Sequence, residues 1–365
     1  MAEAALTRWE RLQHRVAHTL LRLPPRLQVR LSGKRPVERD GLTLHPELQL
    51  LLTLRERLGA VPMSALPPEE TRRRAHREAL VHAGEPIEVG AVRERVLDTA
   101  TGPLKARHYA PMRSEKSQPL LVFFHGGGFV LGDLETHDIA CRLLCRHAGL
   151  HVLAVEYRLA PEHPFPAGLD DTMAAFAWAC EHARELGADP ARIAVGGDSA
   201  GGNLSAVVSQ LTVRKGLPAP VVQFLLYPAV DRTVERASAK LFAEGFFLTK
   251  ADMAWFHEQY TGGSLDRADP RISPLLSPDL SGLPPALVVT AGFDPLRDEG
   301  EAYAQALQRA GTPVTLRRFD GLIHGFANMT GVSPACRDAV VEIASMLRGQ
   351  LDRAASVTAR NGVSR

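Results

Sequence analysis

The sequence is short of cysteine, of aromatic residues and of long apolar runs. Among its 365 residues, four are cysteine and 6% are aromatic. The cysteines are Cys141, Cys145, Cys180 and Cys336. They form no Cys-x-x-Cys pair, which argues against a zinc site and a disulfide framework. No run of about 18 apolar residues occurs, and no apolar signal-peptide core lies near the N-terminus. We therefore expect reduced thiols, a cytoplasmic location and no membrane-spanning helix.

A dominant charge is also lacking. The net charge is +2, with 23% charged and 45% hydrophobic residues. These values are typical of a soluble globular protein and give no reason to expect a nucleic-acid partner. The first strand-to-helix turn has no Gly-x-Gly-x-x-Gly with a partner acid, and no Gly-Lys-Ser/Thr follows the glycine-rich stretch. A dinucleotide-binding dehydrogenase and a phosphate cradle are therefore disfavoured.

Apolar segments with strand character alternate with amphipathic, helix-like segments from about residue 88 onward. The expected strands are 89–99, 104–111, 119–127, 151–158, 192–196, 220–228, 285–292 and 313–319. The expected helices are 138–149, 169–187, 203–214, 298–310 and 336–349. The first two strands flank Thr101-Gly102-Pro103, which predicts a hairpin. Eight strands alternating with helices predict an α/β fold with a mostly parallel sheet covered on both faces.

Two segments fall outside this alternation. Residues 1–87 are helix-rich, and 231–272 are too long for a plain connection between strands. Both are predicted to form a helical cap over the carboxyl edge of the sheet, where ligands bind in open α/β folds. The main domain then spans 88–353, and the tail 354–365 is predicted to be disordered.

The start of the chain is basic and amphipathic. Trp9, Leu12 and Val16 are spaced as one helix face and lie among arginines. Such a helix over 1–35 is able to bind an anionic membrane surface. We favour the alternative that it packs on the cap or on a second subunit. Deleting 1–35 tests the membrane hypothesis, because it would then weaken binding to anionic liposomes.

A serine lies among small residues between a predicted strand and a predicted helix. Gly197-Asp198-Ser199-Ala200-Gly201 has the form Gly-x-Ser-x-Gly. Glycines on both sides let the backbone turn sharply and leave the hydroxyl exposed. The following helix directs its N-terminal amides toward the same place. This context favours Ser199 as a nucleophile over the alternative of a simple tight turn.

A nucleophilic serine that attacks a carbonyl needs donors for the oxyanion. His125-Gly126-Gly127-Gly128 directly follows an apolar strand. Glycines let backbone N–H groups approach a substrate oxygen with no Cβ in the way. We expect the N–H groups of Gly127, Gly128 and Ala200 to form this hole. His125 is interpreted as a structural hydrogen-bonding residue rather than a base.

The serine also needs a base and a group that orients the base. His324 follows the last predicted strand, and Asp294 follows the strand at 285–292. The chain order Ser199, Asp294, His324 is the order found in α/β-hydrolases. We therefore predict these three residues as the catalytic triad. Four aromatic residues are candidates for lining the substrate pocket: Phe129, Phe246, Phe247 and Trp255.

Five blocks carry a resemblance to a known family. HGGGFVLGD, YRLAPEHPFPA, GGDSAGGN, DPLRDEG and HGF occur in this order over about residues 88–350. Together they resemble the hormone-sensitive lipase group of α/β-hydrolases, in its bacterial esterase branch. The resemblance implies the α/β-hydrolase fold, a helical cap, and hydrolysis of short- and medium-chain esters without cofactor or metal. It also implies Ser199 as nucleophile, His324 as base and acid, and Asp294 as the residue that orients it.

Two other functions remain open at this point. An amidase or deacetylase would use the same triad, because the leaving group is selected by the pocket. A non-catalytic binding protein on this scaffold is less favoured, since the chain keeps a histidine at the expected place. The partner expected is a small-molecule ester, and the chain is expected to be a monomer or a homodimer. In the latter, the edge strand 313–319 could pair across a two-fold axis.

Overall fold

An eight-stranded sheet forms the centre of the protein in a computed structural model that describes residues 6–113, 118–263 and 266–362. Its strands are β3 (Ala91–Thr99), β4 (Gly102–Ala110), β5 (Gln118–Phe124), β6 (His151–Val155), β7 (Ala188–Asp198), β8 (Gln223–Leu226), β9 (Ala286–Phe293) and β10 (Val314–Ile323). The spatial order is β10-β9-β8-β7-β5-β6-β4-β3. All neighbours pair in parallel except β4, which runs antiparallel to both β3 and β6. The predicted mostly parallel sheet and the predicted hairpin β3–β4 are confirmed.

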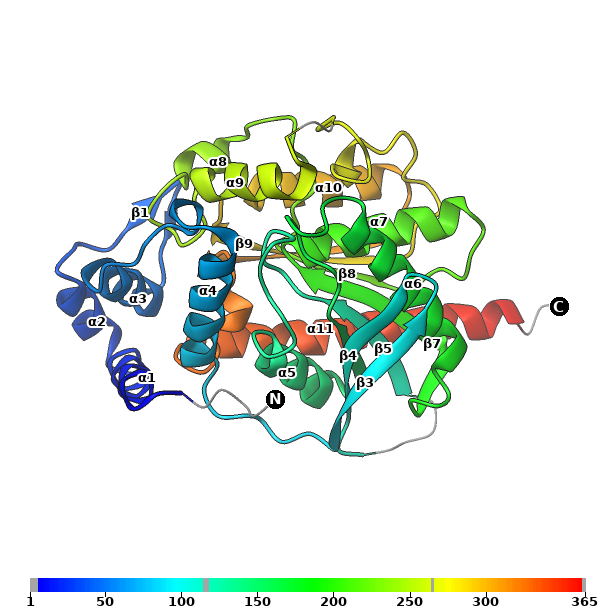
Figure 1. The fold of residues 1–365 in the computed structure, drawn as a ribbon, viewed down its shortest axis with the longest axis horizontal. Coiled ribbons are helices and arrows are strands. Elements are labelled where there is room, and N and C mark those ends of the chain that lie inside the picture. Colours follow the sequence, from blue (N-terminus) through cyan, green and yellow to red (C-terminus); the bar gives the residue numbers. More distant parts are fainter. Residues whose placement is uncertain (1–5, 114–117, 264–265, 363–365) are drawn as a thin grey trace.

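Helices cover both faces of this sheet (Figure 1). They are α5 (Asp138–Ala148), α6 (Ala167–His182), α7 (Ala200–Arg214), α10 (Arg297–Arg309) and α11 (Pro334–Gly362). The buried strand β5 contacts the helices on both faces of the sheet, because successive side chains of a strand point to opposite faces. Leu121 and Phe123 pack into the core that holds α5 and α11. Leu120 and Val122 pack into the core on the opposite face, with α6 and α7.

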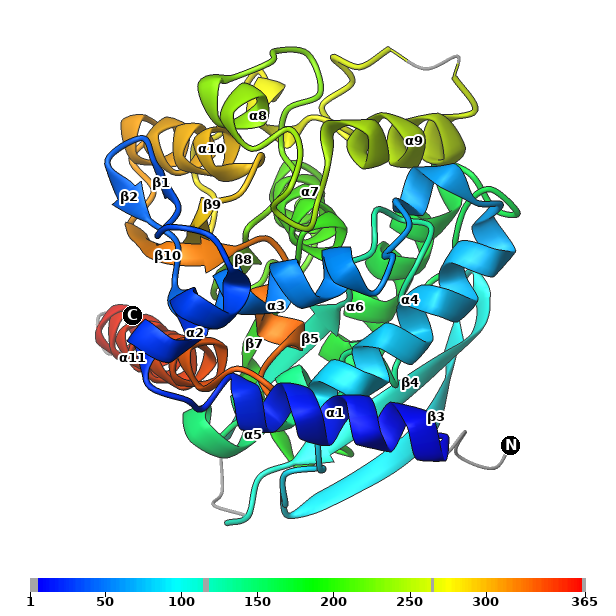
Figure 2. The ribbon, with the colours of Figure 1, turned by 90° about the vertical axis from the view of Figure 1, so that its left-hand side faces the viewer.

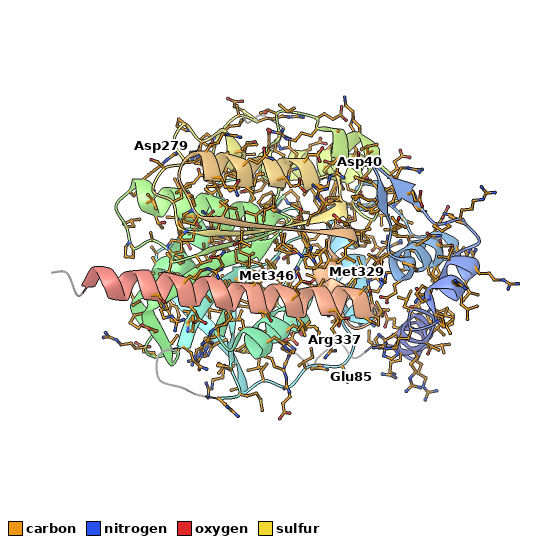
Figure 3. All side chains as sticks on the ribbon, turned by 180° about the vertical axis from the view of Figure 1, so that it is seen from behind. Asp40, Glu85, Asp279, Met329, Arg337 and Met346 are labelled. Carbon is orange, nitrogen blue, oxygen red and sulfur yellow. The ribbon has the colours of Figure 1, made fainter. Side chains whose placement is uncertain are left out.

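The last helix corrects one prediction. The tail from residue 354 was expected to be disordered, but α11 continues to Gly362. Residues 354–362 include three alanines and no proline, which favours a continued helix. Residues 363–365 of that tail lie outside the described residues. Figure 3 shows α11 crossing the rear of the molecule, with Met346 on this helix.

Both segments outside the alternation are helical and lie at the carboxyl edge of the strands (Figure 2). The first contains α1 (Arg8–Leu20), α2 (Pro25–Ser32), the ribbon β1 (Glu38–Arg39) and β2 (Leu42–Thr43), α3 (Pro46–Arg57), the short η1 (Met63–Ala65) and α4 (Pro68–Ala83). The second contains α8 (Ala237–Leu241) and α9 (Lys250–Thr261). The N–H of Ser64 donates to Asp252 Oδ1 at 2.9 Å, which joins η1 to α9. The two segments therefore contact each other above the sheet.

The helix α1 lies against α4 through its polar face. Arg77 Nε donates to Glu10 Oε1 at 2.7 Å, and His14 Nδ1 donates to the carbonyl of Val81 at 2.7 Å. Trp9 and Leu12, on the apolar stripe, are 62% and 50% exposed. The apolar stripe seen in the sequence is thus not the face that packs. Among the described residues, no helix is both long enough and apolar enough to cross a bilayer.

Candidate active site

Ser199 occupies a sharp turn between β7 and α7. Its backbone has φ 54° and ψ −113°, a conformation that a residue with a Cβ rarely adopts. The neighbouring glycines make this turn possible, because a Cβ on Gly201 would lie 1.8 Å from the carbonyl oxygen of Phe124. Helix α7 begins at Ala200, three residues earlier than predicted. Close packing against β5 requires Gly201, and a Cβ on Gly202 would lie 2.9 Å from Pro228 Cβ, so both positions hold glycine despite its low helix propensity.

The three predicted triad residues come together at the ends of β7, β9 and β10. His324 Nε2 lies 2.9 Å from Ser199 Oγ, and His324 Nδ1 lies 2.8 Å from Asp294 Oδ2. The other oxygen of Asp294 accepts the N–H of Leu296 at 2.8 Å, which holds the carboxylate in place. Asp294 is fully buried. The carboxylate therefore selects the tautomer with the proton on Nδ1, which leaves Nε2 free to accept the serine proton.

Gly127, Gly128 and Ala200 line one cavity with Ser199 and His324. In the described part of the chain, no hydrogen bond is seen from the N–H groups of Gly127 and Gly128. The N–H of Ala200 belongs to the first turn of α7, where intrahelical acceptors are missing. A Cβ on Gly128 would lie 2.2 Å from the Phe256 ring, so the loop approaches the cap too closely for a side chain. Three N–H groups thus remain available beside Ser199.

His125 has a structural place in this loop, as its interpretation from the sequence proposed. Its Nδ1 donates to the carbonyl of Gly126 at 2.8 Å, and its ring stacks on Tyr157 with centroids 4.4 Å apart. Burial lowers the pKa of His125 to about 4. The ring is therefore neutral at physiological pH.

A buried ion pair lies directly beneath the nucleophile. Asp198 Oδ1 lies 3.2 Å from His137 Nε2 and accepts the N–H of Gly126 at 2.8 Å. Burial alone would raise the pKa of Asp198, but the His137 imidazolium and the Gly126 N–H lower it. Burial likewise opposes the charge on His137, while Asp198 overrides it and raises its pKa. Asp198 thereby fixes the glycine loop relative to Ser199.

The hydrogen bonds of Thr136 explain the protonation of His137. Thr136 Oγ1 accepts the N–H of Asp133 and donates its proton to the Asp133 carbonyl, each at 2.9 Å. His137 Nδ1 lies 2.9 Å from the same hydroxyl and must donate to it, since that proton is already committed. Nε2 lies 3.2 Å from Asp198 Oδ1 and 3.0 Å from the side-chain amide of Asn328, and the carboxylate favours a proton on this nitrogen as well.

The cap is tied to the glycine loop by two side chains of α4. Arg72 Nε donates to the carbonyl of Val130 at 2.6 Å, and its other nitrogens bind Glu162. His76 Nδ1 lies 2.6 Å from Asp133 Oδ2. This hydrogen bond raises the pKa of His76. The position of α4 is therefore coupled to the loop that carries Gly127 and Gly128.

The cavity above Ser199 has a volume of about 190 Å³ and mostly apolar walls. The cap supplies its roof from both segments, with Met63, Leu66 and Ala75 on one side and Leu248, Met253 and Phe256 on the other. Arg55 and Glu78 are among the polar side chains of the cap that also face it. Arg55 Nη2 donates to Glu78 Oε2 at 3.0 Å, and the Arg55 guanidinium lies 4.6 Å from the centre of the Phe247 ring. The ion pair between Arg55 and Glu78 balances the charges of these two side chains.

Only one of the four predicted aromatic residues lines this cavity in the described structure, namely Phe247. Phe129 turns into the core and stacks on Tyr260, with centroids 3.8 Å apart. Phe246 packs against Phe293 at the end of β9, 5.4 Å between centroids. Trp255 packs edge-on to its neighbour Phe256, and Phe256 is the residue that contributes to the wall. Of each adjacent aromatic pair, Phe246–Phe247 and Trp255–Phe256, only the second residue lines the cavity, which composition and spacing could not reveal.

Several residues of the site were missed by reasoning from the sequence. They are Asp198 and His137 of the ion pair, Arg72 and His76 of the cap, and Arg55 and Glu78 of the cavity wall. A signal for Asp198 was present, because it directly precedes Ser199 at the end of a buried strand. No local signal marked the others, since each acquires its partner through tertiary contacts.

Comparisons with known proteins agree with this fold. Residues 121–328 match a family model described as an alpha/beta hydrolase fold. The chain is 52% identical over 331 residues to a carboxylic ester hydrolase, LipN of Mycobacterium tuberculosis, covering 88% of this chain and 87% of that protein. It is 36% identical to an ethyl acetate hydrolase of Pseudomonas putida, covering 85% of this chain and all of that protein.

Solved structures resemble most of this chain. An ester hydrolase from the metagenome of Lake Arreo superimposes with a TM-score of 0.82 at 43% identity, covering 85% of this chain and 99% of that chain. A thermostable esterase of Pseudomonas putida gives a TM-score of 0.80 at 36% identity, over 86% of this chain and 99% of that one. The chain belongs to the α/β-hydrolase fold family, in its hormone-sensitive lipase-like group.

Proposed function

We propose that this protein is a serine carboxylesterase that hydrolyses short- to medium-chain acyl esters. The observation that carries the proposal is the continuous hydrogen-bonded series Ser199–His324–Asp294 in an apolar cavity. The names of the relatives, which are ester hydrolases and esterases, support the same reaction.

The reaction proceeds by two acyl transfers. His324 Nε2 takes the proton of Ser199 as Oγ attacks the ester carbonyl, and a tetrahedral oxyanion forms. The N–H groups of Gly127, Gly128 and Ala200 stabilise this oxyanion, and His324 then protonates the departing alcohol. Water next attacks the acyl-enzyme, giving its proton to His324, and the acid leaves as Ser199 recovers its proton. Asp294 stabilises the imidazolium in both halves.

The size of the cavity supports short and medium acyl chains. Its volume of about 190 Å³ is below the roughly 300–1,000 Å³ of sites that enclose drug-sized ligands. Met63, Met253 and Phe256 close the space above Ser199. Long acyl chains would have to leave the cavity and expose apolar surface to water.

Hydrolysis of p-nitrophenyl esters from acetate to palmitate tests this function. We expect kcat/KM to be highest for short or medium chains and to fall by about 10-fold or more at palmitate, because the walls exclude the longer chain. Matched p-nitroanilides serve as the comparison. A higher kcat/KM for the anilides would replace the esterase by an amidase, and inactivity on every substrate would contradict hydrolysis.

A further inference from the structure

Among the described residues of the cavity wall, Arg232 is a charged side chain for which no ion-pair partner is seen. The other charged residues of the wall are matched: Arg55 with Glu78, Arg74 with Glu70, and His137 with Asp198. Within the described residues, the Arg232 guanidinium makes no hydrogen bond and has no carboxylate within 4.0 Å, yet it lines the same cavity as Ser199. A cation in a mostly apolar cavity is costly unless a ligand or water satisfies it.

The backbone around Arg232 is held close to the nucleophile. The N–H of Ala229 donates to the carbonyl of Ser199 at 3.3 Å, and the N–H of Arg232 donates to Ser273 Oγ at 2.9 Å. The N–H of Val230, between them, donates to Glu299 Oε1 at 2.7 Å. Such anchoring places the arginine on a rigid base rather than on a free loop.

The two carboxylates that act electrostatically on Arg232, Asp231 and Glu299, also bind other groups. Asp231 binds Arg236 at 2.8 Å and accepts the hydroxyl and N–H of Thr233. Glu299 turns one oxygen to the N–H groups of Val230 and Asp231, and burial raises its pKa to about 7. Burial keeps part of Glu299 in its neutral form near pH 7, and its charged form acts on Arg232 without forming an ion pair with it. Arg232 is therefore only partly balanced on this side of the cavity.

We propose that Arg232 forms a subsite for a carboxylate carried by the substrate, so that the ester accepted includes half-esters of dicarboxylic acids. A guanidinium presents paired N–H groups that match the two oxygens of a carboxylate. The apolar wall around it would strengthen this contact by excluding water. This inference rests on the proposed esterase activity and adds a substrate class to it.

Two series of ethyl esters test the subsite. The first consists of monoethyl succinate, glutarate and adipate. The second replaces each free carboxylate by an isopropyl group of the same shape. The measured quantity is the ratio of kcat/KM for each half-ester to that for its neutral analogue. In Arg232→Met we expect this ratio to fall by about 10- to 100-fold for at least one chain length, because a charge-assisted contact is lost. Arg232→Lys should retain an intermediate ratio.

Arg74→Met is the matched control, because Arg74 lines the same cavity and is already paired with Glu70. It should leave the ratio close to that of the wild type. Salt gives a second measurement that needs no variant: the wild-type ratio should fall as the salt concentration rises. An unchanged ratio in Arg232→Met at all three lengths, or a wild-type ratio insensitive to salt, would overturn the subsite. Failure of the proposed function would look different, since the neutral esters would then not be hydrolysed at all.

Discussion

Replacing Ser199 by alanine is expected to lower kcat/KM for p-nitrophenyl butyrate by about five to six orders of magnitude. The hydroxyl lies 2.9 Å from His324 Nε2 and supplies the only atom in this arrangement that forms the acyl bond. Without it, His324 and the three N–H groups can assist only the direct attack of water. Steady-state kinetics with the purified variant, at high enzyme concentration, measure the residual rate.

Ser205→Ala is the matched control for this prediction. Ser205 lies on the next turn of α7, is fully buried, and donates to the carbonyl of Gly201 at 2.7 Å. Alanine keeps the helix at this position, so activity should stay within about 10-fold of the wild type. A Ser199→Ala variant that retained more than about 1% of wild-type kcat/KM, far above this range, would show that another group attacks the ester.

Replacing Asp198 by alanine is expected to lower the free energy of unfolding by about 3–5 kcal/mol, because it leaves the buried His137 without its counter-ion. The same change removes the acceptor of the Gly126 N–H. Urea unfolding monitored by tryptophan fluorescence measures the difference between variant and wild type. Removing His137 as well, in Asp198→Ala/His137→Leu, should recover part of the loss, since no unpaired charge then remains.

The pH dependence of this loss follows from the two shifted pKa values. The pKa of Asp198 is lower in the folded protein than in the unfolded chain, where it is about 4. Asp198 therefore adds to the free energy of unfolding above about pH 4, and this contribution is lost as the pH falls through the folded pKa. The pKa of His137 is higher in the folded protein than in the unfolded chain, where it is about 6.5. His137 therefore adds to the free energy of unfolding below about pH 6.5, and this contribution is lost as the pH rises through the folded pKa. The loss in Asp198→Ala should therefore be largest between about pH 4 and 6.5. A loss that stayed constant up to alkaline pH would contradict the ion pair.

The sheet and the triad were predictable from the sequence because their signals are local. The central strands β5 to β9 each contain a short apolar run, and Ser199, Asp294 and His324 each follow a predicted strand. In a parallel sheet the carboxyl ends of these strands meet at one edge, so chain order alone indicated which residues would come together. The same reasoning placed Gly127 and Gly128 beside them.

The substrate pocket was less predictable because it depends on side-chain direction. Phe246 and Phe247 are adjacent, yet the first packs against Phe293 and the second lines the cavity. Arg232 looks like one of many surface arginines in the sequence. Its position in the cavity depends on Ser273 and Glu299, which are distant in the chain and fix the backbone around it.

The start of α7 was misplaced for a related reason. Glycine has low helix propensity, and the sequence therefore indicated a helix from Asn203. The structure begins the helix at Ala200, because only glycine fits between α7 and the end of β5. The tight packing that displaced this boundary is also what presents Ser199 at the floor of the cavity.

The most direct test of the central claim is to trap the covalent intermediate. The protein would be treated with a p-nitrophenyl alkylphosphonate, whose phosphorus is attacked by an activated serine and which then releases p-nitrophenol. Mass spectrometry of the digested protein locates the adduct. We expect one phosphonyl group per chain, on Ser199, with loss of esterase activity in proportion to labelling and no labelling in Ser199→Ala. Full inactivation with the phosphonyl group on another residue, or an active enzyme that is never labelled, would contradict the proposed mechanism.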